Sequence, residues 1–241
     1  MKHLAIIILI FTSAQLWADE VTVNWGNANP SVMVDSGGIA LTSAYPTPAF
    51  SGDYTVALGT FDSFSPTETN YNDWQSHWRT FDQAPFNDAV GAFASEAFLE
   101  SDGSSSSVNA DNSASFFNSD AYIWIYNRQD AVANDSEWFL GRVSEWTFPT
   151  DLGGECCGNL TPTQWSLTSD FANASPSEID VVWGAHSSGL YAGGGAYTVA
   201  PENFLVQTYL LIPEPSTWIM MALSFSALMF VGLFRRKGAM R

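Results

Sequence analysis

Positive charge is nearly absent between Asp19 and Ile212. This stretch holds 24 of the chain's 25 acidic residues, three arginines and no lysine, so its formal net charge is −21. Binding to nucleic acid or to anionic lipid needs clustered cations that neutralise phosphates. The composition therefore excludes nucleic acid as a partner, and it suits solubility, the binding of divalent cations, or association with a charged matrix.

Cysteine is equally scarce, because the chain contains only the adjacent pair Cys156 and Cys157 in a glycine-rich stretch. Neighbouring Cα atoms lie about 3.8 Å apart, closer than the usual span of a disulfide, so a vicinal bond needs a tight turn. The flanking glycines permit such a turn. In an oxidising compartment there are three alternatives for this pair: a vicinal disulfide, an intermolecular disulfide, or free thiols. A metal site here is disfavoured, because His77 and His186 are far away in the sequence.

The sequence also lacks the common catalytic motifs, including the phosphate-binding, dinucleotide-binding and zinc-protease patterns. His186 occupies the place where a G-x-S-x-G motif would carry its nucleophile. Glu137 and Glu145, each beside a tryptophan, are the first choices for a glycosidase pair, but sequence cannot set the separation of two carboxylates. We therefore expect no enzymatic activity and no catalytic residues.

One polar loop offers oxygen ligands of the kind that Ca²⁺ prefers. It contains Asp102, Asn109, Asp111 and Asn112, but the ligand spacing of an EF-hand is missing. We expect ordinary solvated loop polarity and no metal site, with Ca²⁺ as the lesser alternative.

The first 18 residues have the layout of a secretory signal peptide. Lys2 precedes an apolar run at residues 4–11, and the small residue Ala18 stands before Asp19. Eight apolar residues are too short to span a bilayer, whose hydrocarbon core is roughly 30 Å thick. We predict entry into the secretion translocon and cleavage by signal peptidase after Ala18.

A second apolar run, at residues 218–234, is 17 residues long and uncharged. It is just long enough for a single membrane-spanning helix, over about residues 217–234. Arg235, Arg236 and Lys237 follow at once, within a basic tail that extends over residues 235–241. The positive-inside rule places these cations in the cytoplasm, so the body between residues 19 and 212 is expected outside.

Pro213, Glu214 and Pro215 stand immediately before this apolar run. Two prolines fix φ and remove two backbone donors, which leaves an extended segment that a processing enzyme can grip. Glu214 adds a charge that keeps the segment at the outer interface. The order of the three residues, the apolar segment and the arginine-rich tail resembles the PEP-CTERM sorting signal, over residues 213–241.

This resemblance implies recognition by an exosortase, a membrane-embedded cysteine transpeptidase-like enzyme that processes the tail during export. It further implies a precursor anchored in the inner membrane of a Gram-negative-type bacterium, and a mature protein at the cell surface or in the extracellular matrix. Proteins with this tail are commonly linked to exopolysaccharide and biofilm matrix.

The body, residues 19–212, is expected to be one acidic β-rich domain. Alternating or β-rich segments separated by turn-forming stretches favour a β-sandwich or jelly roll. The predicted strands are 21–25, 54–61, 90–99, 121–126, 138–143, 181–184 and 204–212. One helix is predicted over residues 70–83, because Trp74, Trp78 and Phe81 fall on one helical face.

These observations favour an exported, non-enzymatic envelope or matrix protein. The alternative is a carbohydrate-binding module that uses exposed aromatic rings to contact extracellular polysaccharide. Tyr122, Trp124 and Trp146 are its candidates, although a buried place in the core is favoured for each. A glycan hydrolase is the third interpretation.

Overall fold

The computed structural model describes residues 20–27, 31–39, 41, 54–85, 92–131, 135–150, 162–173, 175, 178–188 and 204–211. Within these residues the fold is mainly β, as the sequence predicts. None of the helices in this part of the chain has the length and apolarity needed to cross a membrane. The predicted signal peptide, the cysteine pair, the sorting motif and the apolar segment 218–234 lie outside the described residues.

The largest sheet has six strands and is antiparallel throughout. Its main path runs β12-β7-β6-β3-β4, and β9 pairs with the same edge of β7 as β12 does, farther along the strand. The strands are β3 (Thr55–Thr60), β4 (Arg79–Pro85), β6 (Tyr122–Tyr126), β7 (Glu137–Val143), β9 (Ile179–Trp183) and β12 (Tyr209–Leu210).

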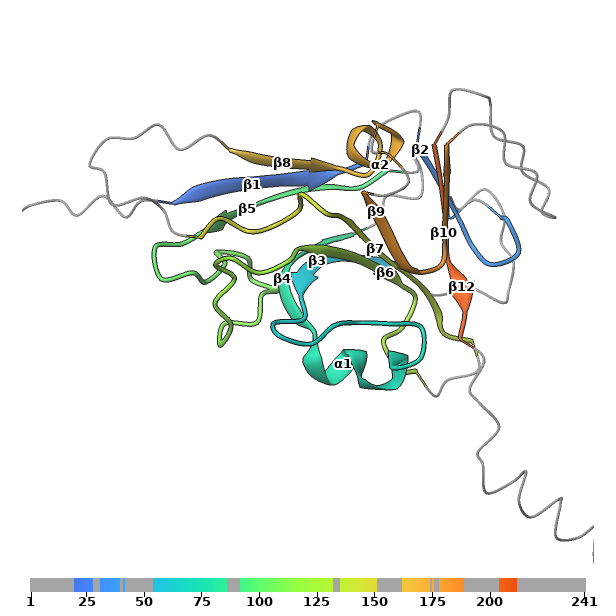
Figure 1. The fold of residues 1–241 in the computed structure, drawn as a ribbon, viewed down its shortest axis with the longest axis horizontal. Coiled ribbons are helices and arrows are strands. Elements are labelled where there is room, and N and C mark those ends of the chain that lie inside the picture. The colour runs from blue at the N-terminus through green and yellow to red at the C-terminus, as the bar shows by residue number, and fades with distance from the viewer. Residues whose placement is uncertain are drawn as a thin grey trace, which may run out of the picture.

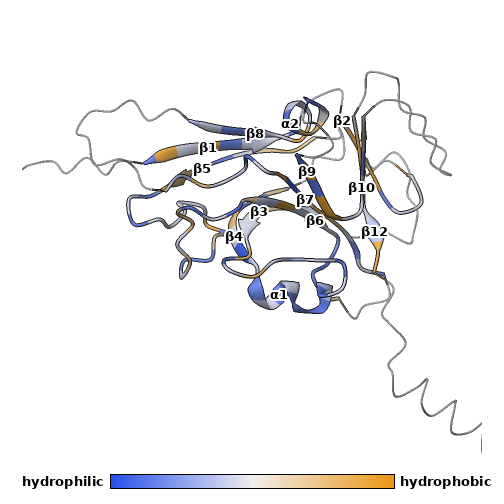
Figure 2. Cartoon of the chain, viewed as in Figure 1, coloured by the Kyte–Doolittle hydropathy of each residue, from blue (hydrophilic) through white to orange (hydrophobic). Residues whose placement is uncertain are grey.

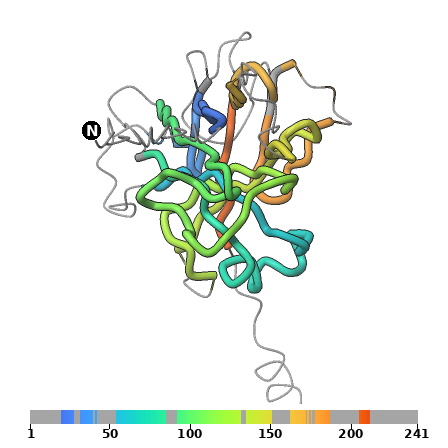
Figure 3. The backbone as a smooth tube through the Cα atoms, turned by 90° about the vertical axis from the view of Figure 1, so that its left-hand side faces the viewer, coloured from blue at the N-terminus to red at the C-terminus, as the bar shows by residue number. Residues whose placement is uncertain are grey.

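Two three-stranded sheets complete the described fold, in the orders β5-β1-β8 and β10-β11-β2. Each contains one antiparallel pair and one parallel pair, the parallel pairs being β1 with β8 and β11 with β2. Figure 3 shows β11, near the C-terminus, beside β2, near the N-terminus. The strands are β1 (Val21–Gly26), β2 (Ser31–Val34), β5 (Ala94–Leu99), β8 (Thr163–Ser166), β10 (Ala185–Ser188) and β11 (Phe204–Gln207).

The β5-β1-β8 sheet lies over one face of the large sheet, and the main apolar core lies between them (Figure 1). Val23 and Leu99 come from the smaller sheet, and Leu58, Ile123 and Phe139 come from the larger one. All five side chains are fully buried. Burial of apolar surface from both sheets is what holds the two layers together.

The other face of the large sheet carries a second core, which we call the aromatic layer. It contains Phe61, Tyr71, Trp74, Trp78, Tyr122, Trp124, Tyr126 and Trp138. The rings meet in stacked and edge-to-face pairs, such as Trp74 on Trp138 at 5.5 Å and Trp124 against Trp138 at 4.9 Å. Such pairs add to the stabilisation from area burial alone.

A short helical segment covers the aromatic layer. It consists of the 3₁₀ turn η1 (Tyr71–Asp73) and the helix α1 (Trp74–His77). In Figure 2 α1 is largely hydrophilic, whereas β6 and β7 carry hydrophobic residues. The buried residues of the helical segment are Tyr71 and Trp74. A second helix, α2 (Ser169–Asn173), follows β8.

The strand predicted at residues 121–126 is confirmed as β6, and its side chains alternate between the two cores. Ile123 and Ile125 of β6 belong to the main core, and Tyr122, Trp124 and Tyr126 belong to the aromatic layer. β6 is therefore buried on both faces, at the centre of the molecule.

The helix predicted over residues 70–83 is wrong for its second half. The helix ends at His77, because Trp78 is extended at φ −67° and ψ 136°, and the chain then enters β4. Trp74 and Trp78 join the aromatic layer, whereas Phe81 lies in the main core on the other face of the sheet. The three residues therefore do not form one helical face and are divided between two cores.

Most predicted strands match observed ones, with shifted ends. The segment predicted at 204–212 is interrupted at Thr208, which separates β11 from β12. Four strands, β2, β4, β8 and β10, were not predicted, and the predicted segment 90–99 forms a strand from Ala94 onward.

Candidate functional site

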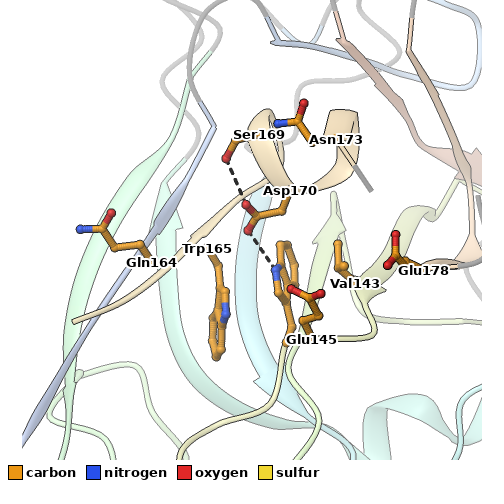
Figure 4. Close-up of a pocket in the computed structure, with 9 residues that line it drawn as sticks. Val143, Glu145, Gln164, Trp165, Ser169, Asp170, Asn173 and Glu178 are labelled. Carbon is orange, nitrogen blue, oxygen red and sulfur yellow. Dashed lines mark hydrogen bonds between the residues drawn. The ribbon is translucent and has the colours of Figure 1, made fainter. Parts of the chain in front are cut away.

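A pocket of about 490 Å³ lies where the end of β7, the strand β8 and the helix α2 meet. This volume is within the range of small-molecule sites. Residues from four stretches of the chain line it (Figure 4): Val143, Glu145, Trp146, Gln164, Trp165, Ser169, Asp170, Asn173 and Glu178.

Asp170 is the best-fixed polar group of the pocket. One carboxylate oxygen accepts hydrogen bonds from Trp146 Nε1 at 3.0 Å and from the backbone N–H of Ser166 at 2.9 Å. The other accepts from the hydroxyl of Ser169 at 3.0 Å. α2 therefore presents a carboxylate whose orientation is set before any ligand arrives.

Two indole rings form the floor of the pocket. The rings of Trp146 and Trp165 lie 5.9 Å apart, and the side chains are only 2% and 6% exposed. Phe171 and Phe148 pack on these rings from the core side. Because so little of each ring is accessible, the floor offers ring edges and not an open stacking platform.

The described lining carries three carboxylates and no cation. The three arginines of the body form ion pairs elsewhere, Arg79 with Asp62 and Asp111, Arg128 with Asp135, and Arg142 with Asp120. Ser175 donates both its N–H and its hydroxyl to Glu178, which lowers the pKa of that carboxyl. The pocket thus repels anions and suits ligands rich in hydroxyl or amine donors.

Figure 4 shows Trp165 between Gln164 on one side and Asp170 and Glu145 on the other. Gln164, Ser169 and Asn173 add neutral donors and acceptors to the rim. No pattern in the sequence predicted this combination, because its members are brought together by the pairing of β1 with β8 and of β7 with β9.

Glu137, a candidate for a glycosidase pair, is fully buried and does not face the pocket. Its carboxylate accepts hydrogen bonds from the hydroxyls of Ser36, Tyr54 and Thr208, at 2.5, 2.9 and 2.8 Å, and from the Ser36 N–H at 3.2 Å. Burial, followed by this charge, raises the pKa of Tyr54. Glu145 is exposed and lines the pocket, so the structure does not bring the two carboxylates into one site.

The two histidines of the body lie in different surroundings. The ring of His77 on α1 is exposed and stacks on Phe64 at 4.2 Å. His186 on β10 lies edge-on to Phe171 at 5.3 Å, and burial lowers its pKa to about 4.

The polar loop considered for Ca²⁺ uses its carboxylates within its own turns. Asp102 accepts from the N–H and hydroxyl of Ser104, and Asp111 accepts from the same groups of Ser113. These bonds lower the pKa of both carboxyls. In the described part of the chain, no three His, Cys, Asp or Glu side chains gather in a metal-binding group.

The aromatic residues considered for sugar stacking are buried, as favoured from the sequence. Trp124 and Tyr122 belong to the aromatic layer, with exposed fractions of 0% and 8%. Trp146 borders the pocket with its indole N–H already bonded to Asp170. Trp165, which also lines the pocket, is not among these candidates.

Comparison of the chain with models of protein families, with curated proteins and with solved structures found no match.

Proposed function

We propose that this chain is an exported cell-envelope or matrix protein, without enzymatic activity, whose C-terminal tail is processed by an exosortase. The observation that carries the proposal is the order of Pro213, Glu214 and Pro215, an uncharged apolar segment, and a cluster of arginine and lysine. In this view a β-sandwich ectodomain lies outside and one membrane helix near residues 217–234 holds the precursor.

The described fold supports this division of the chain. The last described residue, Leu211, is fully buried and donates its N–H to Ser136 O at 2.8 Å. The packed domain therefore extends to within two residues of Pro213. The motif then lies between the domain and the apolar segment, where a membrane enzyme would find it.

The reaction proposed at the tail is acyl transfer through a cysteine of the enzyme. The thiol attacks a peptide carbonyl in or beside the motif and forms a thioester, while the tail leaves as an amine that takes up the proton. Water or an amine then accepts the acyl group and regenerates the thiol. The ectodomain is the acyl part and stays outside, on the cell surface or in the matrix.

The test is expression of the full chain with and without an exosortase, followed by mass spectrometry of the C-terminus of the body. We expect a new C-terminus near residues 213–215 only with the enzyme, and none in a Pro213→Ala/Pro215→Ala double variant. The control is Pro162→Ala, which changes an exposed proline before β8 and should be processed normally. An intact tail in both strains would contradict the proposal.

The pocket favours a second function, binding of a hydroxyl-rich ligand such as a sugar of an extracellular polysaccharide. Its volume, fixed carboxylate and rim of amides suit such a ligand, whereas its charge disfavours anionic polysaccharides. A glycan array with the full-length protein tests this function. Binding to neutral or amine-bearing glycans should fall at least tenfold in Glu145→Ala/Asn173→Ala and persist in Glu96→Ala, a variant of an exposed residue on β5. Uniform signals across all glycans would rule the function out.

A further inference from the structure

The C-terminal end of the domain is fastened at several successive residues. β11 pairs with both β10 and β2. Thr208 then donates its N–H to Val34 O at 3.0 Å and its hydroxyl to Glu137 at 2.8 Å. Thr208 therefore forms a firm boundary between β11 and the short strand that follows.

β12 continues from this boundary along β7. Tyr209 lies opposite Trp138, and Leu210 lies opposite Glu137. Trp183 donates its indole N–H to Tyr209 O at 3.2 Å. The next residue, Leu211, packs into the aromatic layer and donates to Ser136 O.

These contacts differ in strength along β12. The side chains of Tyr209 and Leu210 are 44% and 39% exposed, whereas Leu211 is fully buried. A two-residue strand with exposed side chains contributes few bonds and little buried surface, so the anchorage beyond Thr208 depends mainly on Leu211.

The proposed processing motif follows this anchor almost at once. Only Ile212 separates Leu211 from Pro213, and six residues separate Leu211 from the apolar segment that begins at Trp218. At about 3.3–3.6 Å per residue this connection spans at most about 25 Å. Enzymes that act on a peptide bond commonly hold the substrate extended, with backbone hydrogen bonds over several residues.

We infer that β12 is a latch that must leave β7 before the motif can enter the active-site cleft of the processing enzyme. The inference rests on the proposed sorting function. An extended substrate would offer the backbone groups of residues 209–211 to the enzyme. In the latched state, however, β12 is paired with β7, and Leu211 donates its N–H to Ser136 O. Opening releases Leu211 from the aromatic layer and stops at Thr208, so the rest of the domain stays folded.

Two variants of the full-length chain, each co-expressed with the exosortase, test the latch. The first inserts six Gly and Ser residues between Ile212 and Pro213, which supplies free chain without opening β12. The second, Leu211→Ala, adds no length but weakens the anchor. We expect both to be processed at least about fivefold faster in pulse-chase labelling. The insertion lets the motif reach the enzyme while β12 stays paired. Leu211→Ala shifts the equilibrium between the paired and the released β12 by about tenfold or more, because a buried leucine is lost.

Matched controls separate the latch from other effects. The same six residues inserted after Val108, which is 97% exposed, and Glu96→Ala, at an exposed position on β5, should both be processed at the parent rate. Faster processing of the variant with the insertion before Pro213, without faster processing of Leu211→Ala, would overturn the latch and indicate simple crowding between the domain and the enzyme. Equal rates in all variants would also overturn it, whereas absence of processing in every variant would contradict the sorting function itself.

Discussion

Glu137 is a buried carboxylate that is stabilised by hydrogen bonds and not by a cation. Among the described ion pairs, the three arginines of the body all contact other acids. Four donors from three separate segments replace the water that the carboxylate loses on folding. The side chain therefore joins the turn after β2, the start of β3 and the junction of β11 with β12.

Replacing Glu137 with alanine should lower the free energy of unfolding by about 2–4 kcal/mol, because the buried donors of Ser36, Tyr54 and Thr208 lose their common acceptor. Denaturant unfolding of the full-length protein in detergent measures the change. Glu145→Ala is the control, since that exposed side chain should alter stability by less than about 0.5 kcal/mol. Equal effects of the two substitutions would show that the network does not stabilise the fold.

His186 should make the fold sensitive to mild acid. Burial lowers its pKa to about 4 from an ordinary value of 6.5, so the unfolded chain binds the proton first. The contribution of this residue to stability is complete above pH 6.5 and is lost progressively as the pH falls toward 4. Thermal unfolding of wild type and His186→Gln between pH 7.5 and 4 should show a steeper loss for the wild type in that window. Parallel curves would contradict this assignment.

At the residue scale, the sequence could not predict the hydrogen bonds of Glu137 or the burial of His186. The hydroxyls that bind Glu137 come from positions 71, 83 and 101 residues away along the chain. Alternation or motif spacing carries no information on such separations. Burial of Tyr122, Trp124 and Trp146 was predictable, because large aromatic side chains in β-rich segments are seldom left exposed.

At the scale of elements, β3 and β4 are paired with a change of register next to Gly59. A Cβ atom at this position would lie 2.2 Å from Arg79 O and 2.6 Å from Trp78 Cζ2. Neither the backbone carbonyl nor the packed indole can move away easily, because Trp78 is held in the aromatic layer. Glycine therefore allows the close approach that lets the chain pass from α1 into β4.

Gly59→Ala should destabilise the fold by about 2–3 kcal/mol or more, as overpacking at a rigid position does. Gly37→Ala is the control, since its Cβ would meet only the side chain of Asp35, with Oδ1 at 3.3 Å and Cγ at 4.0 Å. The measurement is again the free energy of unfolding of the full-length protein. A smaller effect at Gly59 than at Gly37 would show that the close approach is not required.

The elements that sequence predicted well are those whose own side chains determine them. β6 alternates between two apolar faces, and β7 is buried along its whole length. β8 and β10 were missed because they are short, largely polar strands that exist only through pairing with β1 and β11. The boundary between α1 and β4 was missed because Trp74, Trp78 and Phe81 satisfy a helical period while tertiary pairing to β3 determines the structure.

At the scale of the whole molecule, the described fold combines two packed sheets, an aromatic layer covered by α1 and a third small sheet, in a body that carries a strongly negative net charge. The pocket and β12 involve different stretches of β7: Val143 lines the pocket, and residues 137–138 pair with β12. A ligand-binding site and a processing site can thus coexist without competing for residues.

The proposed topology places the body outside the membrane, and single-cysteine labelling tests this placement most directly. In a Cys156→Ser/Cys157→Ser background, Val108→Cys places a thiol at a position that is 97% exposed, and Ala239→Cys places one within the basic tail, after Arg235, Arg236 and Lys237. A membrane-impermeant maleimide should label the first variant in intact spheroplasts and the second only after lysis. Protection of Val108→Cys until lysis, together with labelling of Ala239→Cys in intact spheroplasts, would contradict the proposed topology.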